Sequence, residues 1–121
     1  MKVMEYMSAH IATVRPDAPL RDAIDKMDLY QLTALPVVDE DLRVLGIVTE
    51  ADVAKRCESP NAPISECMTA PAISVDADAE IEEAERAFAQ HRLKRAPVTM
   101  DGRLVGMIGR IELCQAKLGD R

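Results

Sequence analysis

Thr49 and Asp52 are the residues of this sequence best suited to chemistry, because they place a hydroxyl and a carboxylate three positions apart. They lie at the end of the run from Gly46 to Asp52, where an apolar stretch gives way to a polar helix start. A carboxylate here can accept hydrogen bonds from both hydroxyls of a cis-diol, and a helix N-terminus attracts phosphate. The same spacing matches a helix capping box, which satisfies free backbone N–H groups and binds no ligand. Both interpretations stay open, since a phosphate can displace a cap.

A second copy of this run, from Gly106 to Glu112, has changed at both polar positions. Gly109 supplies no hydroxyl at the position of Thr49, and Glu112 is one methylene longer than Asp52. A glutamate could still reach a diol, but its carboxylate is less well placed. We therefore expect one competent site at the first copy and a weak or empty one at the second.

The two runs belong to a duplication that covers most of the chain. Met7 and Ser8 recur as Met68 and Thr69 after 61 positions. A series of matches at one fixed spacing indicates a tandem repeat whose copies share a fold. Further pairs at this spacing are Val14 with Val75, Asp17-Ala18 with Asp78-Ala79, Ala23 with Ala84, Leu32 with Leu93, and Pro36-Val37 with Pro97-Val98.

Each copy is expected to form a β-α-β-β-α unit. Its first helix has apolar residues at the i, i+3, i+4 and i+7 spacing of a buried face, beginning after Pro19 at the first helical position. In the second copy Glu85 interrupts that stripe, and Asp101-Gly102 predicts a tight hairpin turn. The expected pieces are residues 12–14, 35–38, 44–48 and 50–57 in the first copy, and 73–75, 96–99, 104–108 and 110–118 in the second.

The expected domain organisation is a first repeat at 1–57, a linker at 58–63 and a second repeat at 64–121. The linker is rich in Pro, Ser and Asn. A lone unit of this size is marginally stable because it buries little surface. Two α+β repeats related by pseudo-twofold symmetry should therefore share a core, with a related pair of clefts between them.

Composition excludes several classes of protein. The 121 residues are 48% hydrophobic, which predicts a folded domain, and a net charge of −6 disfavours nucleic acid and anionic membranes as partners. Cys57, Cys67 and Cys114 have neither metal-ligand nor disulfide spacing, so we expect no metal site and free thiols in a cytoplasmic protein. The N-terminus lacks the apolar region of a signal peptide, and no apolar run could span a membrane.

In combination these features resemble a CBS domain pair, also called a Bateman module. The resemblance covers nearly the whole chain, and its motifs occur in order in both copies. The fold of that family implies two clefts that can hold adenine nucleotides or related adenosyl ligands, and association of pairs into flat homodimers. The motifs are Met7-Ser8 and Met68-Thr69, Leu35 to Asp39 and Ala96 to Val98, and Gly46 to Asp52.

The resemblance also implies roles for single residues. Asp52 would bind the ribose hydroxyls, and Thr49 the ribose or phosphate. Cations from His91 to Arg95 could hold phosphate or simply form a solvated helix end. The other residues of the first site would be Thr33 and Ala34 along the cleft, Ile73 and Leu93 around the adenine, and Arg95 at the phosphate. The second, weaker site would comprise Ala12, Leu32, Lys94 and Glu112.

Two functional hypotheses follow. In the first, the chain is a regulatory energy sensor that binds AMP, ADP, ATP or another adenosyl ligand, requires no cofactor and signals to an unknown effector protein. In the second, it is a ligand-free homodimerisation or protein-interaction module, and Thr49 and Asp52 only cap a helix. An enzyme ranks last, because the sequence has no nucleophile–base pair, no phosphate-binding glycine loop and no metal cluster.

Overall fold

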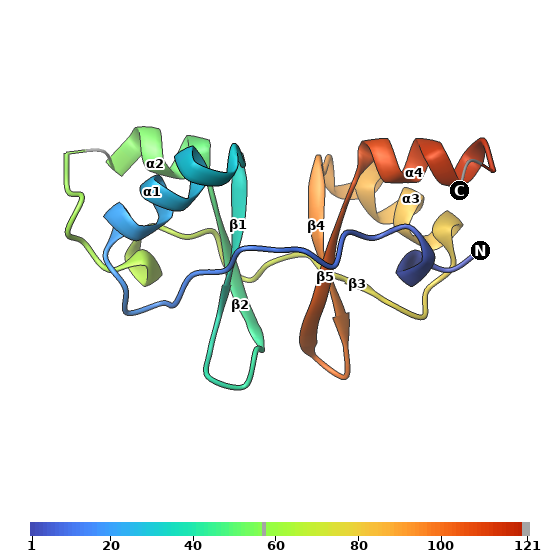
Figure 1. The fold of residues 1–121 in the computed structure, drawn as a ribbon, viewed down its shortest axis with the longest axis horizontal. Helices are drawn as coiled ribbons and strands as arrows, with labels where there is room; N and C mark the ends of the chain where they lie inside the picture. Colours follow the sequence, from blue (N-terminus) through green and yellow to red (C-terminus); the bar gives the residue numbers. More distant parts are fainter. Residues whose placement is uncertain (57, 120–121) are drawn as a thin grey trace. The chain divides into compact units, whose positions relative to one another are not determined.

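The computed structural model describes residues 1–56 and 58–119, which form two compact units (Figure 1). One unit is made of residues 12–72, and the other joins residues 1–11 to the chain from residue 73 onward. Helices and antiparallel strands occur in both, so the expected α+β fold is confirmed. Each unit has its own hydrophobic core of mainly aliphatic side chains, with Phe88 as the one aromatic residue among the buried positions described.

The unit of residues 12–72 packs two helices on a two-stranded hairpin. Leu20, Ala23 and Met27 of the first helix are buried, as the apolar spacing predicts, whereas Ile24 is half-buried at the flank. The first expected strand is reduced to a single parallel bridge between Val14 and Val37. The elements are α1 (Leu20–Tyr30), β1 (Ala34–Val38), β2 (Val44–Thr49) and α2 (Glu50–Arg56).

The other unit repeats this arrangement with a three-stranded sheet in the order β3-β4-β5. Asp101 and Gly102 connect β4 to β5, and both have positive φ angles, of 53° and 80°. This is the tight turn expected from their sequence. The elements are β3 (Val75–Asp76), α3 (Ile81–His91), β4 (Arg95–Met100), β5 (Arg103–Gly109) and α4 (Arg110–Lys117).

The start of α1 is capped by a segment distant in sequence. Pro19 is the N-cap and not the first helical residue, so that prediction was wrong by one position. The backbone N–H groups of Leu20 and Arg21 donate to the carbonyls of Ala62 and Pro60. These are N–H groups that a helix cannot satisfy internally. Residues 58–63 are therefore bound to the unit of residues 12–72 through the start of α1.

Each hairpin also receives a short segment that belongs, by sequence, to the other repeat. Thr69 pairs with Ile47 of β2, and Ser8 pairs with Met107 of β5. The compact units therefore differ from the sequence repeats by these exchanged segments, because residues 1–11 belong to the unit of the second hairpin and residues 64–72 to the unit of the first. A Cβ atom on Gly46 would lie 2.7 Å from the Thr69 carbonyl oxygen, which explains why the motif begins with glycine.

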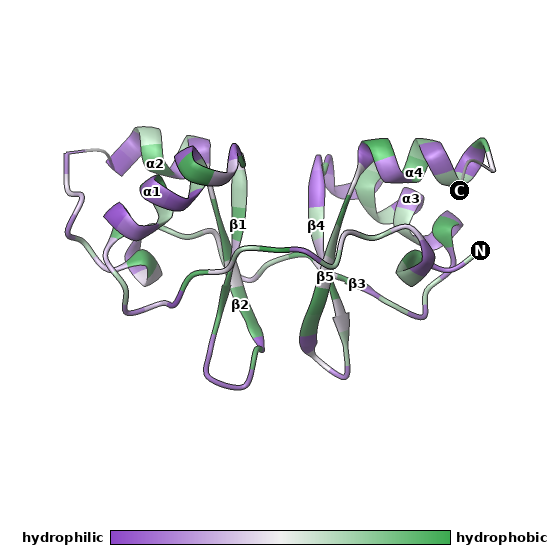
Figure 2. Ribbon diagram, viewed as in Figure 1, coloured by the Kyte–Doolittle hydropathy of each residue, from purple (hydrophilic) through white to green (hydrophobic). Residues whose placement is uncertain are grey.

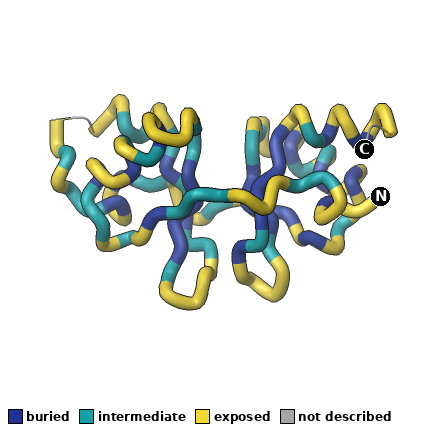
Figure 3. The backbone as a smooth tube through the Cα atoms, in the orientation of Figure 1, coloured by how far each residue is buried: buried dark blue, intermediate teal, exposed yellow. Residues whose placement is uncertain are grey.

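Burial and hydropathy follow the same plan in both units. Figure 2 shows hydrophobic colour along the strands, and Figure 3 shows those strands as mainly buried and the helix exteriors as exposed. Cys67 is buried and Cys114 is exposed, both as free thiols, whereas Cys57 lies outside the described residues. Among the described residues there is no helix long and apolar enough to cross a membrane.

Candidate functional site

Thr49 and Asp52 form a reciprocal cap where β2 meets α2. Oδ2 of Asp52 accepts hydrogen bonds from the backbone N–H of Thr49 at 2.9 Å and from its hydroxyl at 3.1 Å. The backbone N–H of Asp52 donates to Oγ1 of Thr49 at 3.2 Å. This is the capping-box geometry that the spacing predicts, and it fixes the half-buried carboxylate at the start of the helix.

Thr69 is a second hydroxyl partner of Asp52 that the sequence analysis missed. Its Oγ1 lies 3.3 Å from Oδ1 and 3.4 Å from Oδ2 of Asp52. The pairing of Thr69 with Ile47 beside β2 brings this exposed side chain to the carboxylate. The repeated Met68-Thr69 motif marked the segment, but no local pattern showed that it returns to the hairpin.

Four other predicted residues belong to the same unit. Thr33 accepts a backbone hydrogen bond from Glu50 at 3.0 Å, and Ala34 is opposite Thr49 in the β1–β2 ladder. Thr33, Ala34, Thr49 and Asp52 therefore gather at one end of the hairpin. Leu32 precedes them and packs on the core of this unit, as does Ala12 from the segment before Val14.

The corresponding end of the second hairpin has a simpler hydrogen-bond network. Oε1 of Glu112 accepts one hydrogen bond, from the backbone N–H of Gly109 at 2.6 Å. Arg95 is opposite Gly109 in the β4–β5 ladder, and the carbonyl of Lys94 accepts from the N–H of Arg110. The longer side chain of Glu112 thus reaches the cap position, but no hydroxyl of the described residues donates a hydrogen bond to its carboxylate.

Leu93 and Ile73 complete the predicted set in this unit. Leu93 is half-buried and packs on the core, and its carbonyl accepts from Nε of Arg110 at 3.0 Å. Ile73 is exposed two residues before β3. Each predicted site takes residues from both units. That Asp52 and Arg95 contact one ligand in the first site, and Ala12 and Glu112 another in the second, stays a prediction.

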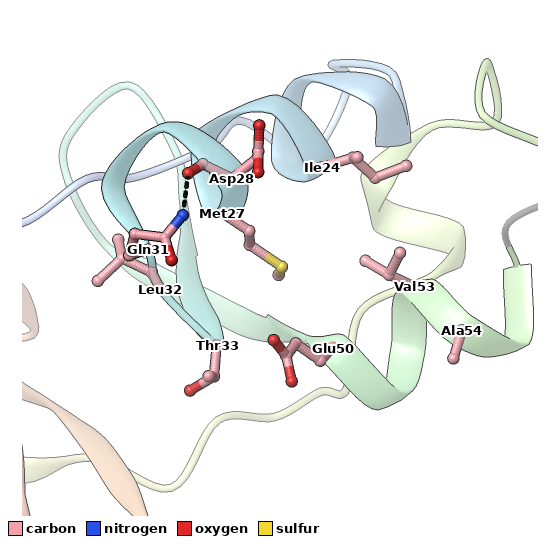
Figure 4. A pocket seen from close by; sticks show the side chains of 9 residues that line it. All are labelled: Ile24, Met27, Asp28, Gln31, Leu32, Thr33, Glu50, Val53 and Ala54. Carbon is pink, nitrogen blue, oxygen red and sulfur yellow. Dashed lines mark hydrogen bonds between the residues drawn. The ribbon is translucent and has the colours of Figure 1, made fainter.

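A groove lies between α1 and α2 in the unit of residues 12–72 (Figure 4). Its volume is about 460 Å³, and apolar side chains of both helices line it. Leu32 and Thr33 belong to its lining, with Glu50 beside Thr33, whereas Asp52 does not. The groove is therefore distinct from the hydroxyl and carboxylate cluster around Asp52.

The chemistry available at the Asp52 cluster is hydrogen bonding. Its carboxylate accepts from hydroxyls, and a ligand diol could take the place of either threonine. Among the described residues no group of His, Cys, Asp and Glu could hold a metal ion. The arrangement fits reversible binding of a hydroxylated ligand.

Comparison with known sequences identifies the repeats. The profile of the CBS domain family matches residues 3–59 and again residues 64–119. YlbB, an uncharacterised protein of Bacillus subtilis strain 168, is 35% identical over 112 residues, which are 88% of this chain and 76% of that protein. Inosine-5'-monophosphate dehydrogenase of Methanocaldococcus jannaschii is 34% identical over 108 residues. That match covers 88% of this chain but 22% of the enzyme.

Solved structures show the same fold. CBSX2 in complex with AMP has a TM-score of 0.87 at 23% identity, covering 98% of this chain and 96% of that chain. The CBS domain pair of protein MJ0100, solved with 5'-methylthioadenosine and S-adenosyl-L-methionine, has a TM-score of 0.86 at 23% identity. That match covers 100% of this chain and 98% of the other. At these identities the likeness is one of fold.

Proposed function

The chain belongs to the CBS domain family as a tandem pair, and from this premise we propose that it is a regulatory module that binds an adenosyl ligand through Asp52. The ligand class is an adenine nucleotide such as AMP, ADP or ATP, or a related molecule such as S-adenosylmethionine. Binding shifts the balance between conformations of the chain only as far as the ligand prefers one of them. The module requires no cofactor and performs no catalysis of its own.

The observation that carries this proposal is the placement of the Asp52 carboxylate. It is half-buried at the start of α2, with the hydroxyls of Thr49 and Thr69 as neighbours. The hydroxyl partners already bound to this carboxylate support the proposal, because a ribose diol offers the same O–H donors. The fold also carries adenosyl ligands in CBSX2 and in the CBS domain pair of protein MJ0100.

We propose the remaining ligand contacts from the resemblance to the family. Thr33 and Ala34 would border the ribose, Ile73 and Leu93 would enclose the adenine, and Arg95 would bind phosphate. The second site, around Glu112, would bind weakly, because its carboxylate has the N–H of Gly109 in place of a threonine hydroxyl. Ala12, Leu32 and Lys94 would complete that weaker site.

The setting of the module is part of the same proposal. Free thiols at Cys67 and Cys114 fit a reducing, cytoplasmic compartment, and the family resemblance implies a homodimer that reports to an effector protein. Neither nucleic acid nor a membrane surface is a proposed partner, given a net charge of −6.

Thermal unfolding with a panel of adenosyl ligands tests this function. AMP, ADP, ATP and S-adenosylmethionine are compared with GMP for the wild type and for Asp52→Asn, which keeps the size of the side chain. A ligand at 100 times its dissociation constant stabilises the fold by about 2.7 kcal/mol. For a chain of this length that raises the melting temperature by several degrees. We expect one adenosyl ligand to raise the melting temperature of the wild type and to leave that of Asp52→Asn unchanged.

Glu112→Gln is the matched control for this experiment. It changes the carboxylate of the weaker site in the same way, so the ligand-induced shift should persist. A panel in which no adenosyl ligand raises the melting temperature at millimolar concentration would reject the proposal.

A ligand-free homodimerisation or interaction module is the second candidate, and one observation favours it. Both carboxylate oxygens of Asp52 already lie within hydrogen-bond distance of hydroxyls of the chain itself. In that case Asp52→Asn lowers the melting temperature equally with and without every ligand, and the oligomeric state remains unchanged.

A further inference from the structure

Met68 packs on the bare backbone of β2. A Cβ atom on Gly46 would lie 2.8 Å from Sδ of Met68 and 3.2 Å from its Cγ, so the thioether occupies the space that a side chain would fill. Met68 also packs against the core of its unit, yet it is only half-buried. Its flexible thioether therefore fills a gap in the packing while part of the side chain stays open to solvent.

Met7 has the same position in the other unit. A Cβ atom on Gly106 of β5 would lie 2.7 Å from Sδ of Met7, and Met7 is likewise half-buried. The two methionines thus share a packing role, but the residues after them differ. The hydroxyl of the residue after Met68 reaches the Asp52 carboxylate, whereas the hydroxyl of Ser8 donates to a backbone carbonyl.

Met68 is the apolar anchor of the segment that follows it. Backbone hydrogen bonds of 2.8 and 3.0 Å join Thr69 to Ile47 of β2, and Oγ1 of Thr69 lies 3.3 Å from Oδ1 of Asp52. The chain between Thr69 and β3 is mostly exposed, so it has few apolar contacts of its own. The packing of Met68 on Gly46 therefore helps to hold these hydrogen bonds in place.

A methionine thioether reacts with peroxides. One oxygen passes from hydrogen peroxide to the sulfur, the O–O bond breaks, an S–O bond forms, and the rest of the peroxide leaves as water. The sulfur loses two electrons and the peroxide gains them, and the product is a polar, bulkier sulfoxide. The Thr69 carbonyl oxygen lies 2.7 Å from the same Cβ position on Gly46. On the strand side the new oxygen would therefore have little room and would face another acceptor.

We propose that Met68 is an oxidation site for hydrogen peroxide or a related small peroxide, and that its sulfoxide releases the following segment from β2 and from Asp52. The oxidised side chain leaves the surface of Gly46, because a polar sulfoxide loses the apolar packing there. Thr69 then loses its pairing with the strand. The effect on binding rests on the function proposed above. The released segment leads to Ile73, a proposed adenine contact, so oxidation lowers the affinity for the ligand.

The rate at which each methionine is oxidised tests whether Met68 is accessible. It is measured by peptide mass spectrometry after brief exposure of the folded protein to hydrogen peroxide. Met1 and Met100 are 51% and 39% exposed, and Met107 is 3% exposed. We expect Met68 to be oxidised more slowly than the first two and faster than Met107. Protection of Met68 equal to that of Met107 would overturn the proposal.

Amide hydrogen exchange, followed by NMR, tests the release of the segment without any ligand. After oxidation we expect the N–H groups of Ile47 and Thr69 to exchange about tenfold faster, a ratio that corresponds to about 1.4 kcal/mol. Met68→Leu keeps an apolar side chain without the sulfur, so both N–H groups should keep their exchange rates after peroxide. Unchanged exchange in the oxidised wild type, or equal acceleration in Met68→Leu, would contradict the proposal.

Met7→Leu is the matched control, since it removes the equivalent sulfur from the other unit. Oxidation of this variant should still accelerate exchange at Ile47 and Thr69. The N–H groups of Ser8 and Met107, which donate to each other's carbonyls, should keep their rates and show that the chain stays folded. Acceleration at all four positions would indicate general damage by peroxide and would reject the role of Met68.

Met68→Gln imitates the polar side chain of the sulfoxide without any oxidant. Before peroxide, exchange at Ile47 and Thr69 should be faster in Met68→Gln than in Met68→Leu. Equal rates in the two variants would show that polarity at this position does not release the segment.

The panel of adenosyl ligands separates this inference from the proposed function. A ligand that raises the melting temperature of the wild type should raise it less after oxidation, and should keep its full effect in oxidised Met68→Leu. If no adenosyl ligand binds before oxidation, the proposed function fails, whereas amide exchange still decides whether oxidation of Met68 releases the segment. If a ligand binds equally well before and after oxidation, the link between Met68 and the ligand is wrong.

Discussion

The two hairpin ends, one at Asp52 and one at Glu112, have the same backbone plan and different side-chain networks. Both have an acid three residues after the N-cap position of the closing helix. At the first end that acid holds two threonine hydroxyls and a backbone N–H, and at the second it holds the N–H of Gly109. Both copies have kept the helix cap, which the fold needs in each unit. The hydroxyl cluster, which binding would need, is present in one.

The largest expected effect tests what the two ends share. Gly46→Ala and Gly106→Ala should each lower the free energy of unfolding by about 1–3 kcal/mol, since the new methyl group overpacks a tight contact. At both glycines a Cβ would lie 2.7 Å from a backbone carbonyl oxygen of the exchanged segment. Urea unfolding measures the loss.

Gly109→Ala is the control for the glycine variants. Its Cβ would find no atom closer than 3.3 Å, and its φ of −128° suits any residue. A loss at Gly109 as large as that at Gly46 would contradict the assignment of the cost to the exchanged segments.

A somewhat smaller effect should separate the two acids. Removing an N-terminal cap costs about 0.5–2 kcal/mol, and we expect Asp52→Ala near the top of that range and Glu112→Ala near its bottom. Asp52→Ala loses hydrogen bonds to two threonine hydroxyls and a backbone N–H, whereas Glu112→Ala loses the hydrogen bond from the N–H of Gly109. Urea unfolding without ligand measures both values, and equal losses would show that the hydroxyls add nothing to the cap.

The hydroxyl of Thr69 should contribute less than the cap as a whole. Thr69→Val keeps the side-chain shape and should cost about 0.5 kcal/mol, the low end for a hydrogen bond, because the contact is long and exposed. The equivalent change in the other repeat, Ser8→Ala, should cost less, because the Ser8 hydroxyl contacts the His10 carbonyl and not Glu112. Thermal unfolding of both variants, with and without ligand, checks this order.

The smallest effect concerns Glu85, which replaces Ile24 on the helix flank. Its hydrogen bond and its charge raise the pKa of Lys117 above the ordinary value of 10.5. Because the folded pKa is the higher one, the stabilising effect is complete below pH 10.5 and is lost as the pH rises through the raised value.

We therefore expect the wild type to have a slightly higher urea midpoint than Lys117→Met at pH 8 to 10. The two midpoints should converge at more alkaline pH. The pair is exposed, so salt should reduce the difference. Lys55→Met provides the reference, because this exposed lysine of α2 forms no ion pair with another described residue. A difference that grows with pH would contradict the assigned direction.

Much of the fold could be predicted because it depends on local patterns. Apolar spacing located the buried side of α1, the Asp101-Gly102 pair located a turn, and the fixed spacing of the repeats fixed the number of β-α-β-β-α copies. The Thr49 to Asp52 cap was also predictable, since its partners are three residues apart. Pro19 was misplaced by one residue because the true cap is completed by carbonyls from residues 60 and 62.

The sequence by itself determined the duplication, through matches at one fixed spacing, and it determined the order of the helices and hairpin strands and the loss of polar groups in the second copy, through residues close together along the chain. The tertiary structure alone decided the contacts between distant segments. It brought Thr69 to Asp52, placed Ser8 beside Met107, and formed the groove between α1 and α2. Such contacts depend on how packed elements approach one another, and the residues involved are too far apart in sequence for any periodic pattern to record them.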